Sequence, residues 1–245
     1  MTTIRLLLIF CLGICTSARA QFSDSAHYYF NYNSTGSINK TNDGSSYLLN
    51  NGFKFSVKKK TGVLNLNNNW IYGRSQTDLT NNDYNASLDF DLYQKKIPHF
   101  YYWGLANYTT SVSLKINNQL QTGAGAAYSL YDKPNAYLNI SEGLLFETSN
   151  LFLNDTTHDI YHTFRNSLRV QFRFVVKNIF VIDGSNFLQN SLSRGSDYIV
   201  RSNLNLSVKL QKWLSFTTAF NYNKFNRTSR ENLLLSYGLS FEKYF

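Results

Sequence analysis

The sequence predicts an all-β protein, an antiparallel transmembrane β-barrel of about twelve strands. Three observations predict this class. The chain beyond residue 20 repeats long runs of alternating polar and apolar residues separated by polar turns. The N-terminus has the features of an export signal, and the last alternating run ends on an aromatic residue. Together they indicate a protein that is exported and then inserted in a membrane as strands.

Residues 1–20 are predicted to be a cleavable signal peptide, which leaves residues 21–245 as the barrel. Arg5 supplies the positive charge of such a signal, and Leu6 through Cys15 form its apolar segment. Ala18-Arg19-Ala20 then provides a small-residue cleavage site before Gln21. We therefore predict export and localisation in the outer membrane of a Gram-negative bacterium.

The signal also contains both cysteines, Cys11 and Cys15, so the mature chain is expected to have no disulfide. Removing Arg5 and Arg19 from the 24 basic residues leaves 22 against 15 acidic residues, a net charge of +7. A positive balance of this size favours anionic lipids or solutes, and it is equally typical of solvated loop lysines.

The strand prediction rests on a period of two residues. From His162 to Phe174 one face carries Phe164, Leu168, Val170, Phe172 and Phe174, and the other carries Thr163, Arg165, Ser167, Arg169, Gln171 and Arg173. The run from Tyr198 to Leu210 alternates in the same way. These runs exceed the five or six residues of an ordinary strand and suit the roughly 9 to 11 that span a membrane. Because a soluble two-sheet sandwich shows the same alternation, that architecture remains an alternative.

Polar turn signals set the number of strands. They lie at residues 42–44, 60–62, 77–83, 95–96, 113–118, 132–134, 154–158, 177–178, 193–196, 211–212 and 226–230. Eleven turns divide the mature chain into about twelve strands, and an even number places both termini on the periplasmic side. Short turns are expected there, with longer loops outside.

Two stretches, 135–153 and 179–192, fit this pattern least well. Glu142 has the same parity as Leu138 and Leu144, although the latter two belong to an apolar face. Either a bulge shifts the register near Glu142, or the face assignment is wrong.

The last strand carries the most specific signal. Leu233, Leu235, Tyr237, Leu239, Phe241 and Phe245 share one face, and the chain ends on Phe245. Lys243 interrupts this row near the expected membrane edge, where a lysine can reach water. We predict that Tyr237, Leu239, Phe241 and Phe245 form the signal that the barrel-assembly machinery recognises, and that lipid and lipopolysaccharide surround the folded chain.

The residues also resemble a known family, the salt-induced outer membrane proteins, a YdiY-like family of unknown function in Gram-negative bacteria. The matching features are Asn33-Ser34-Thr35-Gly36, the segment from Phe100 to Leu105, the glycine-alternating stretch from Gln121 to Tyr128, and Gly238 to Phe241. The resemblance implies a barrel and brings no catalytic residues. The abundance of Asn and Lys suggests a source of the Bacteroidetes type.

A row of basic residues is the candidate functional feature of the lumen. Arg165, Arg169 and Arg173 recur on the polar face of one strand, and Arg201 and Lys209 lie on a later strand. They would line a path that selects anions. The structural alternative, which we favour, pairs them with the lumen acids Asp89 and Asp91.

Other chemistry finds little support in the sequence. Gly123, Gly125 and Ala127 lack the context of a phosphate loop and are expected to leave room for a bulky neighbour. His158 and His162 have no third ligand at suitable spacing, so we predict no metal site and no cofactor. His162 and Ser167 have opposite parity, which argues against a catalytic pair on one face. With an export signal and no basic cluster, nucleic acid is not an expected partner.

The predicted function is therefore that of a structural barrel or a narrow passive pore for small solutes, with anions as the candidate class. A barrel enzyme acting on lipid or lipopolysaccharide is the alternative.

Overall fold

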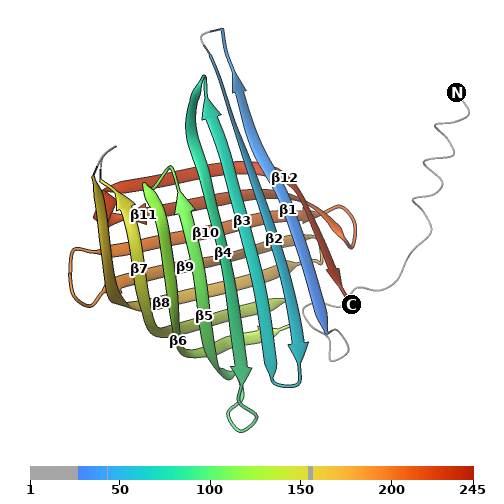
Figure 1. The fold of residues 1–245 in the computed structure, drawn as a ribbon. Coiled ribbons are helices and arrows are strands. Elements are labelled where there is room, and N and C mark those ends of the chain that lie inside the picture. Colours follow the sequence, from blue (N-terminus) through green and yellow to red (C-terminus); the bar gives the residue numbers. More distant parts are fainter. Residues whose placement is uncertain (1–26, 43, 154–156) are drawn as a thin grey trace, which may run out of the picture.

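Twelve strands form one closed barrel in a computed structural model, which describes residues 27–42, 44–153 and 157–245. Each strand pairs antiparallel with its neighbours in the chain, and β1 closes the barrel on β12 (Figure 1). The predicted class and strand number are confirmed, and the alternative of a two-sheet sandwich is wrong because the sheet closes on itself. The predicted signal peptide, residues 1–20, lies outside the described residues.

The strands are long, from 12 residues in β5 to 19 in β8. Their bounds are β1 (Tyr28–Lys40), β2 (Ser45–Lys59), β3 (Gly62–Ser75), β4 (Asp78–Tyr93), β5 (Phe100–Ser111), β6 (Ile116–Lys133), β7 (Ala136–Phe152), β8 (His158–Val176), β9 (Phe180–Ser191), β10 (Tyr198–Lys209), β11 (Leu214–Phe225) and β12 (Arg230–Tyr244), with one short 3-10 helix, η2 (Asn226–Thr228). Among the described residues no helix has the length and apolar character needed to cross a membrane.

The barrel is polar inside and apolar outside. On β8, Arg165 and Ser167 are buried, whereas the alternating Phe164 and Leu168 are exposed. The same holds around the barrel, where most buried side chains are Ser, Thr, Asn and Gln and many Leu, Phe and Tyr side chains face outward. This distribution is the reverse of a soluble core and is the one expected when the outer surface contacts lipid.

The connections between strands differ from the expected pattern. Residues 77–83 were predicted as a turn, yet β4 begins at Asp78 and only residues 76–77 connect it to β3. At the opposite end residues 60–61 form an equally short connection. The predicted contrast between short turns and longer loops is therefore wrong, because the strands continue through residues that composition alone assigns to loops.

Near Glu142, β7 shows neither the predicted bulge nor a wrong face assignment. The pairing of β7 with β8 runs without a shift from Ala136 to Phe152, so no bulge lies at Glu142. Glu142 is exposed on the outer face together with Ile140 and Leu144. The face assignment was correct, and the carboxylate simply interrupts the apolar surface.

The glycine-alternating stretch of β6 makes room for a bulky side chain, as predicted. A Cβ added to Gly125 would lie 2.6 Å from Cζ2 of Trp103, and one added to Gly143 would lie 2.4 Å from the same atom. Trp103 packs in a buried cluster with Ala127 and Leu145. The small residues of β6 and β7 therefore allow the indole to lie flat against the inner wall.

Candidate functional site

The lumen holds a cavity of about 1160 Å³, which we call the vestibule. All twelve strands contribute to its wall, and so do residues of the connections, among them Thr61, Lys95 and Pro134. These connections lie at the end of the barrel where β1 begins and β12 ends, and there His27 N–H donates to the Phe245 carbonyl at 2.8 Å. The vestibule therefore occupies this end of the lumen.

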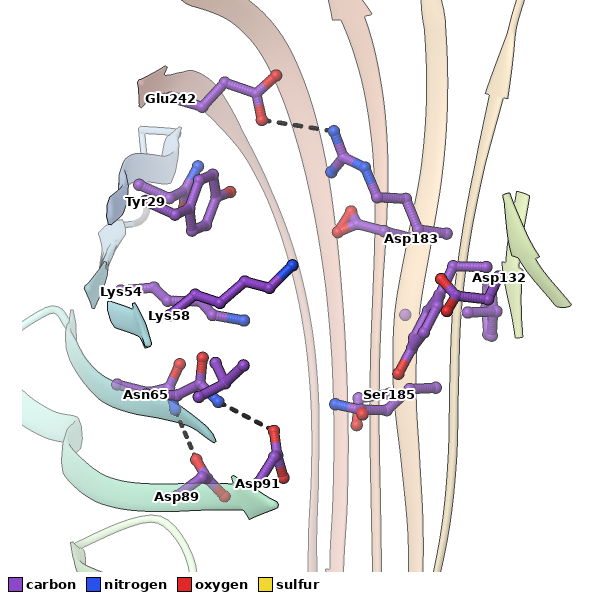
Figure 2. A pocket seen from close by; sticks show the side chains of 18 of the residues that line it. Tyr29, Lys54, Lys58, Asn65, Asp89, Asp91, Asp132, Asp183, Ser185 and Glu242 are labelled. Atoms are coloured by element: carbon purple, nitrogen blue, oxygen red, sulfur yellow. Dashed lines mark hydrogen bonds and ion pairs between the residues drawn. The ribbon is translucent and has the colours of Figure 1, made fainter. Parts of the chain in front are cut away.

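Charged side chains of both signs project into the vestibule, as Figure 2 shows. Lys54 and Lys58 extend from β2, and Asp89 and Asp91 extend from the neighbouring part of the wall on β4. Asn67 donates to Asp89 at 2.8 Å, and Asn65 donates to Asp91 at 3.3 Å. The amides thus orient the two carboxylates toward the lumen.

Another part of the vestibule wall carries a set of ion pairs centred on Glu242. Arg173 Nη2 lies 3.4 Å from Glu242 Oε2, and Lys209 Nζ lies 3.5 Å from Glu242 Oε1. These contacts connect β8, β10 and β12 across the lumen surface. The single carboxylate offsets one of the two positive charges, so the cluster keeps a net positive charge.

Arg169 and Lys54 are two vestibule cations that form no ion pair within the described chain. Arg169 donates from Nε to Ser141 Oγ at 3.0 Å, and its guanidinium lies 5.9 Å from the ring of Trp103. Lys54 is exposed within the vestibule and lies 6.0 Å from the ring of Tyr29. Within the described part of the chain, neither side chain has a carboxylate within 4.0 Å. Their charges are available to a solute in the vestibule.

The other end of the lumen is filled by a buried ionic network, which we call the plug and which consists of Glu147, Asp159, Arg165, Asp197 and Arg227. Arg165 binds Glu147 through two nitrogens, at 2.7 and 2.9 Å, and Asp197 at 2.8 Å. Arg227 binds Asp197 at 2.9 Å and Asp159 at 2.7 Å. The side chains of Arg165 and Glu147 are 0% exposed, so no solvent reaches this pair.

Neutral side chains complete the plug. Gln121 Nε2 donates to Glu147 Oε2 at 2.6 Å and to Gln189 Oε1 at 2.9 Å, which links β6 with β9. The Arg227 guanidinium lies 3.4 Å from the ring of Tyr161. Tyr161 also packs against a buried apolar cluster made of Leu114, Ile116, Leu151, Ile199 and Phe225. The plug therefore combines strand residues with residues of the two connections that carry Asp197 and Arg227.

The predicted basic row divides between these two regions. Arg169, Arg173, Asp89 and Asp91 line the vestibule, whereas Arg165 belongs to the plug. Arg201 donates to Gln119 at 2.9 Å, and Lys209 pairs with Glu242.

The expected ion pairs of this row with Asp89 and Asp91 are wrong. In the described chain the partners are Glu147, Asp197 and Glu242. Sequence reasoning missed these three acids and Arg227. The inward parity of Glu147 and Glu242 was a usable signal, but nothing local marks Asp197 or Arg227 as lumen residues.

The remaining predicted residues lie as follows. Tyr237, Leu239 and Phe241 belong to the outer row of β12, and the exposed Phe245 directly follows the strand. Their recognition by the assembly machinery stays a prediction. His162 is exposed and Ser167 is buried, on opposite faces of β8 as predicted. Within the described ranges, no three residues among His, Cys, Asp and Glu gather in a way that could hold a metal ion.

Comparison with known families identifies the chain. A family model described as "Protein of unknown function, DUF481" matches residues 34–236. The chain belongs to this family. No curated protein matches the sequence. The salt-induced, YdiY-like name that the sequence resembles stays a prediction.

The chain is similar to several solved structures of barrels. The NanC porin is similar with a TM-score of 0.51 and 7% identity, over 89% of this chain and 99% of that chain. The translocator domain of the autotransporter NalP from Neisseria meningitidis is similar with a TM-score of 0.46 and 10% identity, over 98% and 94%. The KdgM porin gives 0.42 and 11%, over 87% and 98%. At 7% identity the likeness to the NanC porin concerns the barrel fold alone.

Proposed function

We propose that the protein is an outer-membrane barrel whose lumen is a narrow, pore-like passage for small solutes, closed in this conformation by the plug. The observation that carries the proposal is the division of one polar lumen into an open vestibule and an ionic network whose central residues, Arg165, Glu147 and Asp197, are enclosed. A barrel with a purely structural role needs no vestibule lined by charges. An apolar outer surface and a polar interior support placement in a membrane.

The orientation follows from the barrel itself. The start of β1 and the end of β12 lie at the vestibule end, and in barrels of this kind those strand ends face the periplasm. The vestibule then opens toward the periplasm, and the plug lies toward the outside. Arg227 and Asp197, which come from the connections at that end, are positioned to respond to changes there.

Small anions are the proposed solutes. The cations that line the vestibule outnumber the carboxylates by seven to five: Lys54, Lys58, Lys60, Lys95, Lys133, Arg169 and Arg173 against Asp89, Asp91, Asp132, Asp183 and Glu242. Charged rings or clusters of this kind select ions of the opposite sign in pores. Nothing among the described residues favours the alternative of a lipid-acting enzyme, so we propose no second function.

Planar-bilayer conductance tests the proposal. We expect the unaltered protein to pass almost no steady current, because the plug fills the lumen. The double variant Glu147→Ala/Arg165→Ala removes one acid and one base together and empties the centre of the plug, so it is expected to conduct steadily. The matched control Arg173→Ala/Lys209→Ala shortens two lumen cations outside the plug and is expected to stay closed.

Ion preference provides the second readout. In the conducting double variant, the further change Arg169→Gln is expected to lower the permeability ratio of chloride to potassium. Arg194→Gln, in the exposed connection between β9 and β10, is the control and should leave the ratio unchanged. If every variant folds and none conducts, the lumen is not a passage. An unchanged ratio in Arg169→Gln would exclude anion selection at this site.

A further inference from the structure

The barrel seam between β1 and β12 closes over only part of its length. The two strands pair from Tyr29 opposite Tyr244 to Gly36 opposite Tyr237. Beyond that point β1 continues to Lys40 and β12 reaches back to Arg230, but neither pairs with the other. Figure 1 shows the two strands diverging away from the C-terminus, β1 upward and β12 across the barrel. The Thr35–Ser236 hydrogen bond, at 2.9 Å, marks the end of the closed part.

A second cavity of about 370 Å³ lies in this opening. Leu233, Leu234 and Leu235 of β12 line one side of it, and the other side includes Ser37 of β1 and Leu48 of β2. The volume falls within the range of small-molecule pockets. The cavity is separate from the vestibule and shares no lining residue with it.

The opening lies at the level of the membrane. A spanning strand uses about 9 to 11 residues. We take Lys243 as the membrane edge and count back along β12 from Phe241, the preceding residue on the outer face. The spanning length then includes Leu233 and Leu235. These two leucines are 60% and 58% exposed. An unpaired strand edge in hydrocarbon leaves backbone groups without partners, which is costly unless something covers them.

The pocket has a polar end as well as an apolar one. Arg74 lines the same cavity and donates from Nη2 to the Thr77 carbonyl at 2.9 Å. Its Nε–H is buried and has no hydrogen-bond partner among the described residues. The side chain as a whole is partly exposed, so its guanidinium gives the cavity a positively charged end, and anionic oxygens are the acceptors that arginine binds most strongly.

We infer that the open part of the seam is a lateral binding site for one acyl chain of an outer-leaflet lipid with an anionic headgroup. The chain lies along Leu233 to Leu235, and the headgroup accepts a hydrogen bond from Arg74. The leucines supply the apolar contact, the position of the opening gives access from the leaflet, and the lipid covers the unpaired edge of β12. This site goes beyond the proposed pore and does not depend on conduction.

Binding of a fluorescent fatty acid, cis-parinaric acid, to the refolded protein in a neutral maltoside detergent tests the inference. We expect saturable binding that dodecyl phosphate displaces and dodecyltrimethylammonium, with the same chain and the opposite charge, does not. Arg74→Gln is expected to weaken the affinity for dodecyl phosphate by about tenfold, as loss of a charge-assisted hydrogen bond does. It should leave the affinity for neutral dodecanol unchanged.

Two tryptophan variants, one that fills the pocket and one outside it, test the position of the binding site. Leu234→Trp places a large ring in the cavity and is expected to abolish saturable binding. Leu239→Trp adds the same ring to the outer face of the closed part of β12 and is expected to bind as the unaltered protein does. Heat-modifiable migration on gels confirms that each variant is folded.

Three outcomes would overturn the inference. They are the absence of saturable binding, binding that Leu234→Trp does not affect, and equal displacement by the anionic and cationic detergents. A protein that is dimeric when unaltered and monomeric as Leu234→Trp would assign the open edge to a second copy of the chain instead of a lipid.

Discussion

Replacing Arg165 by glutamine is expected to lower the free energy of unfolding by about 3–5 kcal/mol. Arg165 is the cation that Glu147 and Asp197 share, and all three side chains are enclosed. Without the guanidinium, Glu147 keeps only neutral donors among the described residues, Gln121, Ser149 and Tyr161. A buried carboxylate that loses its counter-ion costs far more than the loss of an exposed ion pair, which is worth about 0–1 kcal/mol.

Chemical denaturation of the protein folded into lipid vesicles measures this loss. Arg201→Gln is the control, because Arg201 lies in the same lumen but binds only the neutral Gln119 among the contacts of the described chain, and a change of about 1 kcal/mol is expected there. The double variant Glu147→Gln/Arg165→Gln should lose less than Arg165→Gln alone, because it removes the unpaired carboxylate. Equal losses in Arg165→Gln and Arg201→Gln would contradict a shared ionic network at the plug.

Replacing Gly125 by valine is expected to impair folding, with a loss of at least about 3 kcal/mol, the upper end of the usual cost of overpacking. A Cβ at this position would lie 2.1 Å from the Glu142 carbonyl oxygen and 2.6 Å from Trp103. The nearest atom belongs to the backbone of the paired strand, so no side-chain rotation relieves the contact. The β6–β7 pairing itself has to shift.

The yield of heat-modifiable barrel after refolding reports this effect. Gly104→Val is the matched control, since a Cβ on Gly104 meets only one atom, the Gly123 carbonyl oxygen at 3.9 Å. We expect Gly104→Val to refold like the unaltered chain and Gly125→Val to give a strongly reduced yield. Comparable yields would show that the close packing under Trp103 does not constrain the barrel.

Most of the fold could be predicted from local sequence, because strand faces depend only on a period of two residues. Phe164 and Arg165 lie on the predicted faces for this reason, and eleven turn signals are sufficient to count the strands. The ends of the strands were harder to predict. Residues 77–83 have the composition of a loop, yet β4 begins at Asp78 because pairing with β3 extends beyond the length needed for spanning.

The arrangement of the lumen could be predicted only in part. Parity identifies Arg165 as an inward residue, but its partners depend on how the barrel closes and on where the connections fold. Asp197 and Arg227 come from such connections, and their positions have no local sequence signal. The open seam could not be predicted either. The part of β12 that does not pair with β1 consists of typical strand residues, so nothing in the local sequence marks it.

Cysteine labelling from each side of the membrane tests the central claim most directly, a one-sided vestibule closed by a plug in a membrane barrel. Both native cysteines lie in the predicted signal, so residues 21–245 contain none. Lys54→Cys places a thiol in the vestibule, and Ser167→Cys places one at a buried position just beyond it. We expect a membrane-impermeant maleimide to label Lys54→Cys only when the periplasmic side is opened, and to leave Ser167→Cys unlabelled from both sides. Labelling of both thiols from the cell exterior would contradict this structure of the lumen. So would a Lys54→Cys thiol that the maleimide labels from neither side.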